Sequence, residues 1–347
     1  MVIKKWVHLV VFLGAAWSPA QAPEPDSGGA VPKQNDPDQY TKRIQLLGWV
    51  GAQFQDTDRE GIESFADIST AYLGLHINMA PSWRAFAEIE YEHVPNIDDT
   101  PTETEIILER AYLEYNRSHA VKLRLGRFNT PAGIWKPLHW DVSVDTIALP
   151  IMEDNGYLPI KSTGLEFLGT RFTTQSEWNY AFLASGVSED APTNQTLDEA
   201  RAVGGDLNFF YHERFLLGTS YYTYRGQGNR KISVNGLQPY MDLYLVPGRL
   251  LWRTEFLTLK RRDAPDVTTY YSKLKWQIDA KNYVNYRYDR GDDERRAEGG
   301  DHRVQSLTYG FWPRNDTRIK LELADHRIQT ESRDRFKVWS LWIGYIF

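Results

Sequence analysis

The sequence FKVWSLWIGYIF, from Phe336 to Phe347, ends the chain on an aromatic residue. Every second position from Phe347 back to Trp339 is apolar or aromatic, which is the period of one face of a β-strand. At the edge of a soluble sheet, so hydrophobic a strand would recruit other strands through its unpaired backbone groups. A closed barrel in a membrane has no such edge and offers lipid to the apolar face. The stretch therefore favours the last strand of a membrane barrel over a core strand of a soluble protein.

The same ending resembles the C-terminal signature of bacterial outer-membrane β-barrel proteins, in which a final strand with alternate apolar residues stops at a Phe. In that family the barrel-assembly machinery reads this strand. The resemblance implies that Tyr345 and Phe347 belong to an assembly signal and that the assembly machinery is a partner.

The start of the chain has the pattern of a secretory signal. Two lysines precede an apolar run from Trp6 to Trp17, which is too short for a membrane-spanning helix of about 20 residues. Small residues offer cleavage after Ala20 or after Ala22, and the first is preferred because Pro23 would directly follow the second cut. We therefore expect export from the cytoplasm.

The predicted organisation has three parts. Residues 1–20 are the signal peptide, residues 21–40 are a disordered periplasmic tail rich in Pro, Gly and Asp, and residues 41–347 form the barrel. The chain has no cysteine, which excludes disulfides, thiolate metal sites and haem attachment through CxxCH.

The composition agrees with a barrel rather than a helical membrane protein. Charged residues make up 25% of the chain and the mean hydropathy is -0.52, because only every second residue of a barrel strand faces lipid while the others line a wet lumen. The 20 Tyr and 12 Trp residues suit the aromatic girdles at the two membrane interfaces.

The fold class predicted from these patterns is all-β, a transmembrane antiparallel β-barrel of about 16 strands with short periplasmic turns and long extracellular loops. Tight turns follow every second predicted strand. Near Phe215 and Tyr240, the sequence does not show clearly which side chains face inward and which outward. The predicted strands are residues 44–55, 68–79, 83–94, 105–116, 121–128, 161–172, 177–187, 201–211, 215–225, 238–246, 250–260, 267–278, 281–289, 303–312, 317–327 and 336–347.

Charged residues alternate with apolar ones along several of these segments. An Arg or Lys facing lipid at the membrane midplane would cost about 2–4 kcal/mol, so the charged face must be the lumen. A soluble amphipathic sheet has the same alternation, and only the combination with the signal sequence and the ending separates the two. The candidate lumen residues are Arg84, Glu88, Glu90, Arg110, Glu114, Lys122, Arg124, Arg253, Glu255, Lys273, Lys275, Arg287, Lys320 and Glu322.

The longest predicted connection covers residues 129–160. A loop this long is usually functional or disordered, and its apolar residues argue against disorder. We expect it to fold back and narrow the pore, with Trp135 and Trp140 holding it against the inner wall; a sugar-binding platform is the alternative for the tryptophans. The alternative for its carboxylates is solvation or pairing within the loop. The candidate constriction residues are Lys136, Asp141, Asp145, Glu153 and Asp154.

The stretch RAYLEYNRSHAVKLRLGRFNTPAGIWKP, residues 110–137, resembles the phosphate-selective porin O and P type family. The resemblance implies a sixteen-stranded, often trimeric channel for small solutes. Phosphate selectivity does not carry over, because those porins use lysines at the constriction whereas this loop has Lys136 against four acidic residues. Weak ion selectivity that leans towards cations, or an organic solute, is expected instead.

No catalytic or cofactor motif is found. The sequence contains no GxSxG, HExxH, P-loop or dinucleotide fingerprint, and its His residues lack ligand spacing. The acidic and basic run at residues 289–301 lacks the EF-hand order of calcium ligands and suits a solvated loop near lipopolysaccharide. We therefore expect no enzyme, no cofactor, no metal and no nucleic-acid partner.

The function predicted from the sequence is that of an outer-membrane porin, a passive diffusion channel for ions or small hydrophilic solutes. Its expected partners are outer-membrane lipid and lipopolysaccharide, the assembly machinery, the solutes and two further copies in a homotrimer. A non-channel barrel for adhesion or scaffolding is the first alternative and an outer-membrane lipid hydrolase the second. The sequence does not identify the solute, the ion preference or the oligomeric state.

Overall fold

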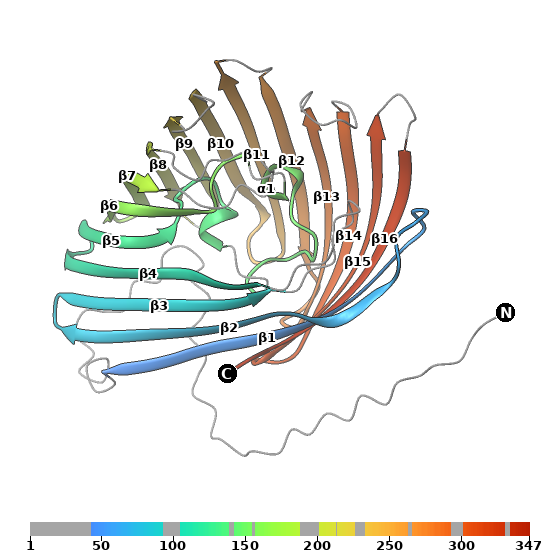
Figure 1. The fold of residues 1–347 in the computed structure, drawn as a ribbon, viewed down its shortest axis with the longest axis horizontal. Coiled ribbons are helices and arrows are strands. Elements are labelled where there is room, and N and C mark those ends of the chain that lie inside the picture. The colour runs from blue at the N-terminus through green and yellow to red at the C-terminus, as the bar shows by residue number, and fades with distance from the viewer. Residues whose placement is uncertain are drawn as a thin grey trace.

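A computed structural model describes residues 43–92, 105–138, 142–154, 157–187, 201–212, 214–225, 233–262, 266–292, 301–329 and 334–347. Within these ranges sixteen strands form one closed antiparallel barrel, in which each strand pairs with its neighbours in sequence and β1 pairs with β16 (Figure 1). The predicted fold class is thereby confirmed. The strands are β1 Ile44–Thr57, β2 Phe65–Ala80, β3 Trp83–Glu92, β4 Glu105–Ser118, β5 Val121–Asn129, β6 Lys161–Phe172, β7 Ser176–Val187, β8 Arg201–Tyr211, β9 Phe215–Arg225, β10 Ser233–Val246, β11 Leu250–Arg261, β12 Val267–Gln277, β13 Asn282–Asp292, β14 Asp301–Arg314, β15 Thr317–Gln329 and β16 Asp334–Ile346.

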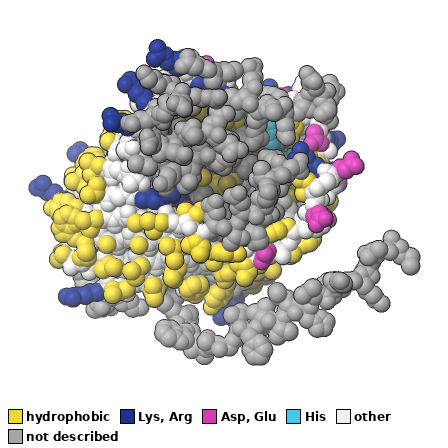
Figure 2. All heavy atoms as spheres, in the orientation of Figure 1, with side chains coloured by type: hydrophobic (Ala, Val, Ile, Leu, Met, Phe, Trp, Pro, Cys, Tyr) yellow, Lys and Arg dark blue, Asp and Glu magenta, His cyan; other side chains and the backbone are white. Residues whose placement is uncertain are grey.

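The strands separate an apolar outside from a polar inside. On β15, Leu321 is exposed on the outer face, whereas its neighbours Lys320 and Glu322 are buried inside the barrel. Hydrophobic side chains cover the flank formed by β1 to β4 (Figure 2). In the described part of the chain, no helix is long and apolar enough to cross a membrane.

The two ends of the barrel differ. The connections after the even-numbered strands from β2 to β14 have two to four residues and lie at the end where β1 starts and β16 stops. Two of these turns contain a residue with positive φ, His212 at 46° and Gly248 at 70°, which lets the chain reverse in a few residues.

Strand β10 begins five residues earlier than the sequence predicts, at Ser233 rather than at residue 238. The missed residues, 233–237, include Asn235 and Gly236, a pair that is typical of turns and depleted in strands. On the β9 side the ladder continues through Pro239, which pairs with Thr219. On the β11 side the paired positions pass from Leu237 to Tyr240 and leave a gap at the proline. Strand β10 therefore continues through Pro239 because its ladder with β9 is unbroken there.

The last residue closes the barrel. The N–H of Phe347 donates to the carbonyl of Gly48 at 2.9 Å, and the N–H of Gly48 donates to the carbonyl of Phe347 at 3.1 Å. A Cβ atom on Gly48 would lie 2.3 Å from the Phe347 ring, so the ring can cover this position only because it is a glycine.

The lumen is partly filled by the chain between β5 and β6. This segment contains a short 3₁₀-helix, η2 Lys136–Leu138, and one turn of α-helix, α1 Ile151–Asp154. In Figure 1 it lies inside the ring of strands, with α1 next to β12 and β13. We call the part from residue 130 to residue 160 the inner loop.

Candidate functional site

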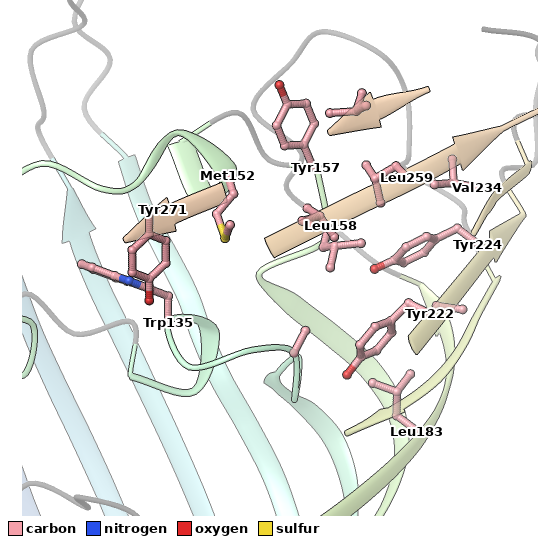
Figure 3. Close-up of a cluster of buried hydrophobic side chains, with 14 of the residues drawn as sticks. Trp135, Met152, Tyr157, Leu158, Leu183, Tyr222, Tyr224, Val234, Leu259 and Tyr271 are labelled. Atoms are coloured by element: carbon pink, nitrogen blue, oxygen red, sulfur yellow. The ribbon is translucent and has the colours of Figure 1, made fainter. Parts of the chain in front are cut away.

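The inner loop packs against the barrel wall through apolar side chains. Trp135, Met152 and Leu158 belong to one buried cluster with Tyr222 and Tyr271 of the wall (Figure 3). The rings of Trp135 and Tyr271 meet edge to face, with centroids 6.3 Å apart. Trp135 therefore holds the loop to the inner wall, as the sequence predicts. The other tryptophan with this predicted role, Trp140, lies outside the described residues.

The first turn of the loop is fixed by hydrogen bonds to β9 and β11. The N–H of Gly133 donates to Ser220 Oγ, and the N–H of Ile134 donates to Glu255 Oε2, both at 2.9 Å. Gly133 has a φ of 65°, and a Cβ there would lie 2.2 Å from Glu255 Oε2 and from Gln238 Nε2. Glycine is therefore required at this contact between the loop and the wall.

Asp145 anchors the middle of the loop. Its carboxylate accepts from Lys273 Nζ at 3.0 Å and from Lys275 Nζ at 2.7 Å, both on β12. Burial raises the pKa of Asp145, but the charges of Lys275 and Lys273 outweigh it and hold the pKa well below its usual range. Asp145 is therefore ionised and paired at neutral pH.

The next four residues of the loop, 146–149, are held by three charged wall residues. Arg287 donates to the carbonyls of Ala148 at 2.7 Å and Leu149 at 3.1 Å. Glu322 accepts the N–H of Ile147 at 3.0 Å and that of Ala148 at 2.9 Å. The ammonium group of Lys320 donates to the carbonyl of Thr146 at 3.0 Å. These wall charges satisfy backbone groups that would otherwise be buried without partners.

The remaining candidates of the constriction fall into two groups. Lys136 and Glu153 form an ion pair with each other, and both side chains are almost fully buried. The pair therefore joins η2 to α1 inside the loop. Asp141 and the side chain of Asp154 lie outside what the structure describes.

A second part of the wall, on β3 to β6, carries ion pairs between strands. Arg110 Nη2 lies 2.6 Å from Glu88 Oε2, and Arg124 bridges Glu114 at 2.7 Å and Glu166 at 3.1 Å. In each pair the arginine is the more exposed partner, for example 25% for the Arg124 side chain against 6% for Glu114. Arg84 and Lys122 are partly buried and Glu90 is buried on the same inner face. Cationic groups therefore cover the carboxylates on this side of the lumen.

A similar pair lies on β10 and β11, where Arg253 makes two hydrogen bonds of 2.7 Å to the Asp242 carboxylate. With this pair, all the predicted wall residues lie on the inner face of the barrel. Alternation places them on this face because one residue in two must face away from lipid.

Several polar residues of the lumen were not predicted. Asp242 and Glu166 obey the same alternation and could have been found from it. Glu109, which pairs with Lys161, could not, because it is adjacent to the inward-facing Arg110. The register between β3 and β4 shifts beside Glu88, so that β4 has one extra residue and both side chains turn inward.

A metal site is not evident in the described ranges, since no three His, Asp or Glu side chains there come together in a group that could hold an ion. Two histidines on β14 and β15 do meet, with His302 Nε2 lying 3.3 Å from His326 Nδ1.

Comparison with known proteins shows which solved structures share this fold. No model of a protein family and no curated protein matches the sequence. Among solved structures, the anion-selective porin from Comamonas acidovorans is 14% identical over 88% of this chain and 99% of that chain, with a TM-score of 0.66. The outer membrane channel DcaP of Acinetobacter baumannii is 11% identical over 88% of this chain and 97% of that chain, with a TM-score of 0.60.

OmpF of Salmonella typhi, in complex with daunomycin, is 10% identical over 88% of this chain and 97% of that chain, with a TM-score of 0.59. At these identities the likeness concerns the fold alone. The barrel has the fold of the bacterial outer-membrane porins, which confirms the broad prediction. The narrower likeness to the phosphate-selective porin O and P type family is not confirmed.

Proposed function

We propose that this protein is a porin of the bacterial outer membrane, through which small hydrophilic solutes diffuse passively. One observation carries the proposal: the described parts of the inner loop lie within a closed sixteen-stranded barrel and are fixed to its wall at several points. A loop that is fixed to the wall in this way reduces the cross-section of the lumen and stays in one position. Export through the predicted signal sequence at residues 1–20 and assembly as a homotrimer belong to the same proposal.

We infer that the channel prefers small anions, the opposite of the preference that the acidic loop residues suggest. Asp145 and Glu153 are each neutralised by lysines. On the wall of β3 to β6, the exposed partners of the ion pairs are Arg110 and Arg124. An ion in the lumen therefore meets guanidinium groups before carboxylates, and such groups lining a pore favour anions. One structural neighbour is itself described as anion-selective.

Single-channel recording in planar bilayers tests the proposal. The refolded chain should give discrete conductance steps, and a variant with a shortened inner loop should give larger steps. A folded barrel that stays silent in both forms would contradict the channel and support a plugged barrel for adhesion or scaffolding. Hydrolysis of outer-membrane lipid by a silent barrel, abolished by changing one Ser or His, would support an enzyme instead.

The reversal potential in a salt gradient tests the ion preference. Replacing Arg110 and Arg124 with Gln removes the guanidinium groups that pair with Glu88, Glu114 and Glu166, and should shift the preference towards cations. Arg171→Gln is the matched control, because this exposed arginine lies beside the exposed Trp178 on the outer face. An equal shift in the control would show that the arginines of the lumen do not set the selectivity.

A further inference from the structure

Two histidines on neighbouring strands face the lumen. His302 of β14 comes two residues before Val304, and His326 of β15 comes two residues after Ala324. Val304 and Ala324 point inward, where they belong to a buried cluster with Ile151 of the inner loop. Because side chains two apart on a strand share a face, both imidazoles lie on the inner face as well. We call these two residues the histidine pair.

The histidine pair lies near the end of the barrel opposite the short turns. Strand β14 begins at Asp301 and β15 ends at Gln329, so each histidine is within a few residues of a strand end. Both histidines are partly exposed. An ion can therefore reach the pair from the lumen without crossing the apolar outer face.

The spacing of two imidazole nitrogens suits a metal ion. His302 Nε2 lies 3.3 Å from His326 Nδ1, and the ring centroids are 5.5 Å apart. Zinc binds imidazole nitrogen at about 2.0–2.1 Å with tetrahedral angles, so two histidine ligands of one such ion have their nitrogens about 3.3–3.4 Å apart. The rings therefore need only a small rotation to aim both lone pairs at a shared ion.

One of the two rings is held in place by an aromatic neighbour. His326 stacks on Phe336 of β16, with ring centroids 4.7 Å apart and planes inclined by 11°. A ligand whose rotamer is fixed by packing loses less conformational entropy when the ion binds. The stacked ring of His326 therefore gives the ion a rigid first ligand, and the rotation falls to His302.

The arginines near the histidine pair each have a carboxylate partner. Arg59, whose guanidinium group lies 4.8 Å from the centroid of the Phe336 ring, pairs with Asp334 at 3.2 Å. Arg287 pairs with Asp289 at 2.7 Å. These carboxylates offset the positive charge that would otherwise repel a cation.

We propose that the histidine pair binds a divalent transition-metal ion such as Cu²⁺ or Zn²⁺, with water completing the coordination. Imidazole nitrogen suits these ions, whereas Mg²⁺ and Ca²⁺ take oxygen ligands. On binding, the proton between the two nitrogens moves to the other nitrogen of its own ring, so both imidazoles stay neutral and each donates one lone pair. The bound ion links β14 to β15 beside the cluster that holds Ile151 of the inner loop.

The site needs only these two protein ligands. They are 24 residues apart in the chain, so the spacing of histidines in the sequence does not reveal them. The pairing of β14 with β15 places Val304 opposite His326 and Ile328 opposite His302, which makes the two histidines diagonal neighbours on one face. Binding at this place does not require the pore to conduct.

Titration of Cu²⁺ into the refolded chain in detergent, with no histidine tag, tests the metal site. Electron paramagnetic resonance should show one tightly bound Cu²⁺ per chain with splitting from two imidazole nitrogens. His302→Gln and His326→Gln should each weaken binding by at least about a hundredfold, since even changing a residue that only supports a ligand costs about 10–100-fold. Zn²⁺ should compete for the same site, and millimolar Mg²⁺ should not.

His76→Gln is the matched control. His76 of β2 also lies against a phenylalanine of the wall, with its ring centroid 6.4 Å from that of Phe86, but it does not belong to the histidine pair. This variant should bind Cu²⁺ like the wild type. An equal loss of binding in His76→Gln, or displacement of Cu²⁺ by Mg²⁺, would identify an adventitious ion only.

Several other outcomes would overturn the metal site. These are a wild type that binds no Cu²⁺, a resonance signal with oxygen ligands alone, and unchanged binding by His302→Gln and His326→Gln. The nitrogen splitting of the wild type decides the question even where a variant does not refold. Conductance of the same preparations reports on the proposed channel alone: a silent barrel that binds Cu²⁺ would contradict only the channel, and a conducting barrel that binds none would contradict only the metal site.

Discussion

At the scale of the residue, the buried pair of Lys136 and Glu153 gives the clearest prediction. Removing one partner leaves the other charge buried alone, which costs about 3–5 kcal/mol, whereas replacing both by apolar residues of similar volume is often neutral. Lys136→Met should therefore detach η2 from α1 and make the inner loop sensitive to protease. Adding Glu153→Leu should restore resistance. Limited proteolysis of the folded barrel measures both, and a double variant as labile as the single one would contradict a role confined to pairing.

Asp145 gives a prediction about pH. Its folded pKa is depressed by Lys275 and Lys273 despite burial, so the stability it contributes is present above the unfolded pKa of about 4. That stability is lost only as the pH falls through the lower folded pKa. The current noise that reports loop motion should thus be the same at pH 6.5 and pH 5. Asp145→Asn should be noisier at both values, and noise in the wild type that grew below pH 6 would contradict this anchor.

The residues of the site show which features could be predicted from the sequence and which could not. Alternation places Lys273, Lys275 and Arg287 in the lumen because the membrane excludes them from the other face. It cannot pair them with the loop, since Asp145 precedes Lys273 by 128 residues and Lys275 by 130. Such contacts depend on how the closed barrel brings distant strands to one loop.

At the scale of the element, strands were predictable wherever side chains alternate and turn residues bound them. Two of the departures, the early start of β10 and the extra residue of β4, concern the local backbone rather than the side-chain pattern. Pro239 lacks the N–H that a ladder needs, and the bulge at Glu109 reverses the side on which the following residues fall. Neither effect changes hydrophobic periodicity over enough residues to be recognised.

Pro239 therefore offers a test of the β10 ladder. Pro239→Val should restore a donor opposite β11 and raise the free energy of unfolding by about 0.5–1.5 kcal/mol, the net value of one hydrogen bond. Urea unfolding in detergent micelles measures the change. Leu237→Val, at an exposed position on the same face of the same strand, is a control for altered β propensity. A variant less stable than the wild type would show that the proline matches a twist the strand requires.

At the scale of the whole molecule, the barrel closes where its first and last strands meet, and Phe347 is the last residue of that seam. Its backbone exchanges two hydrogen bonds with Gly48, while its ring covers the glycine on the outer face. Closure removes the edge that would make the terminal strand prone to aggregation. The backbone and the side chain of one residue thus have separable tasks, one in the ladder and one, as we propose, in recognition by the assembly machinery.

Two variants separate these tasks. Phe347→Ala keeps both hydrogen bonds, so the refolded barrel should lose little stability, whereas deletion of Phe347 should cost about 2 kcal/mol for the two lost bonds. In cells, the alanine variant should nevertheless reach the outer membrane at a clearly lower level than the wild type, because the aromatic ring of the proposed assembly signal is missing. Quantifying folded barrel in membrane fractions, alongside refolding in vitro, measures both effects. Normal membrane levels of the alanine variant would confine the role of Phe347 to closing the barrel, since the backbone alone would then account for assembly.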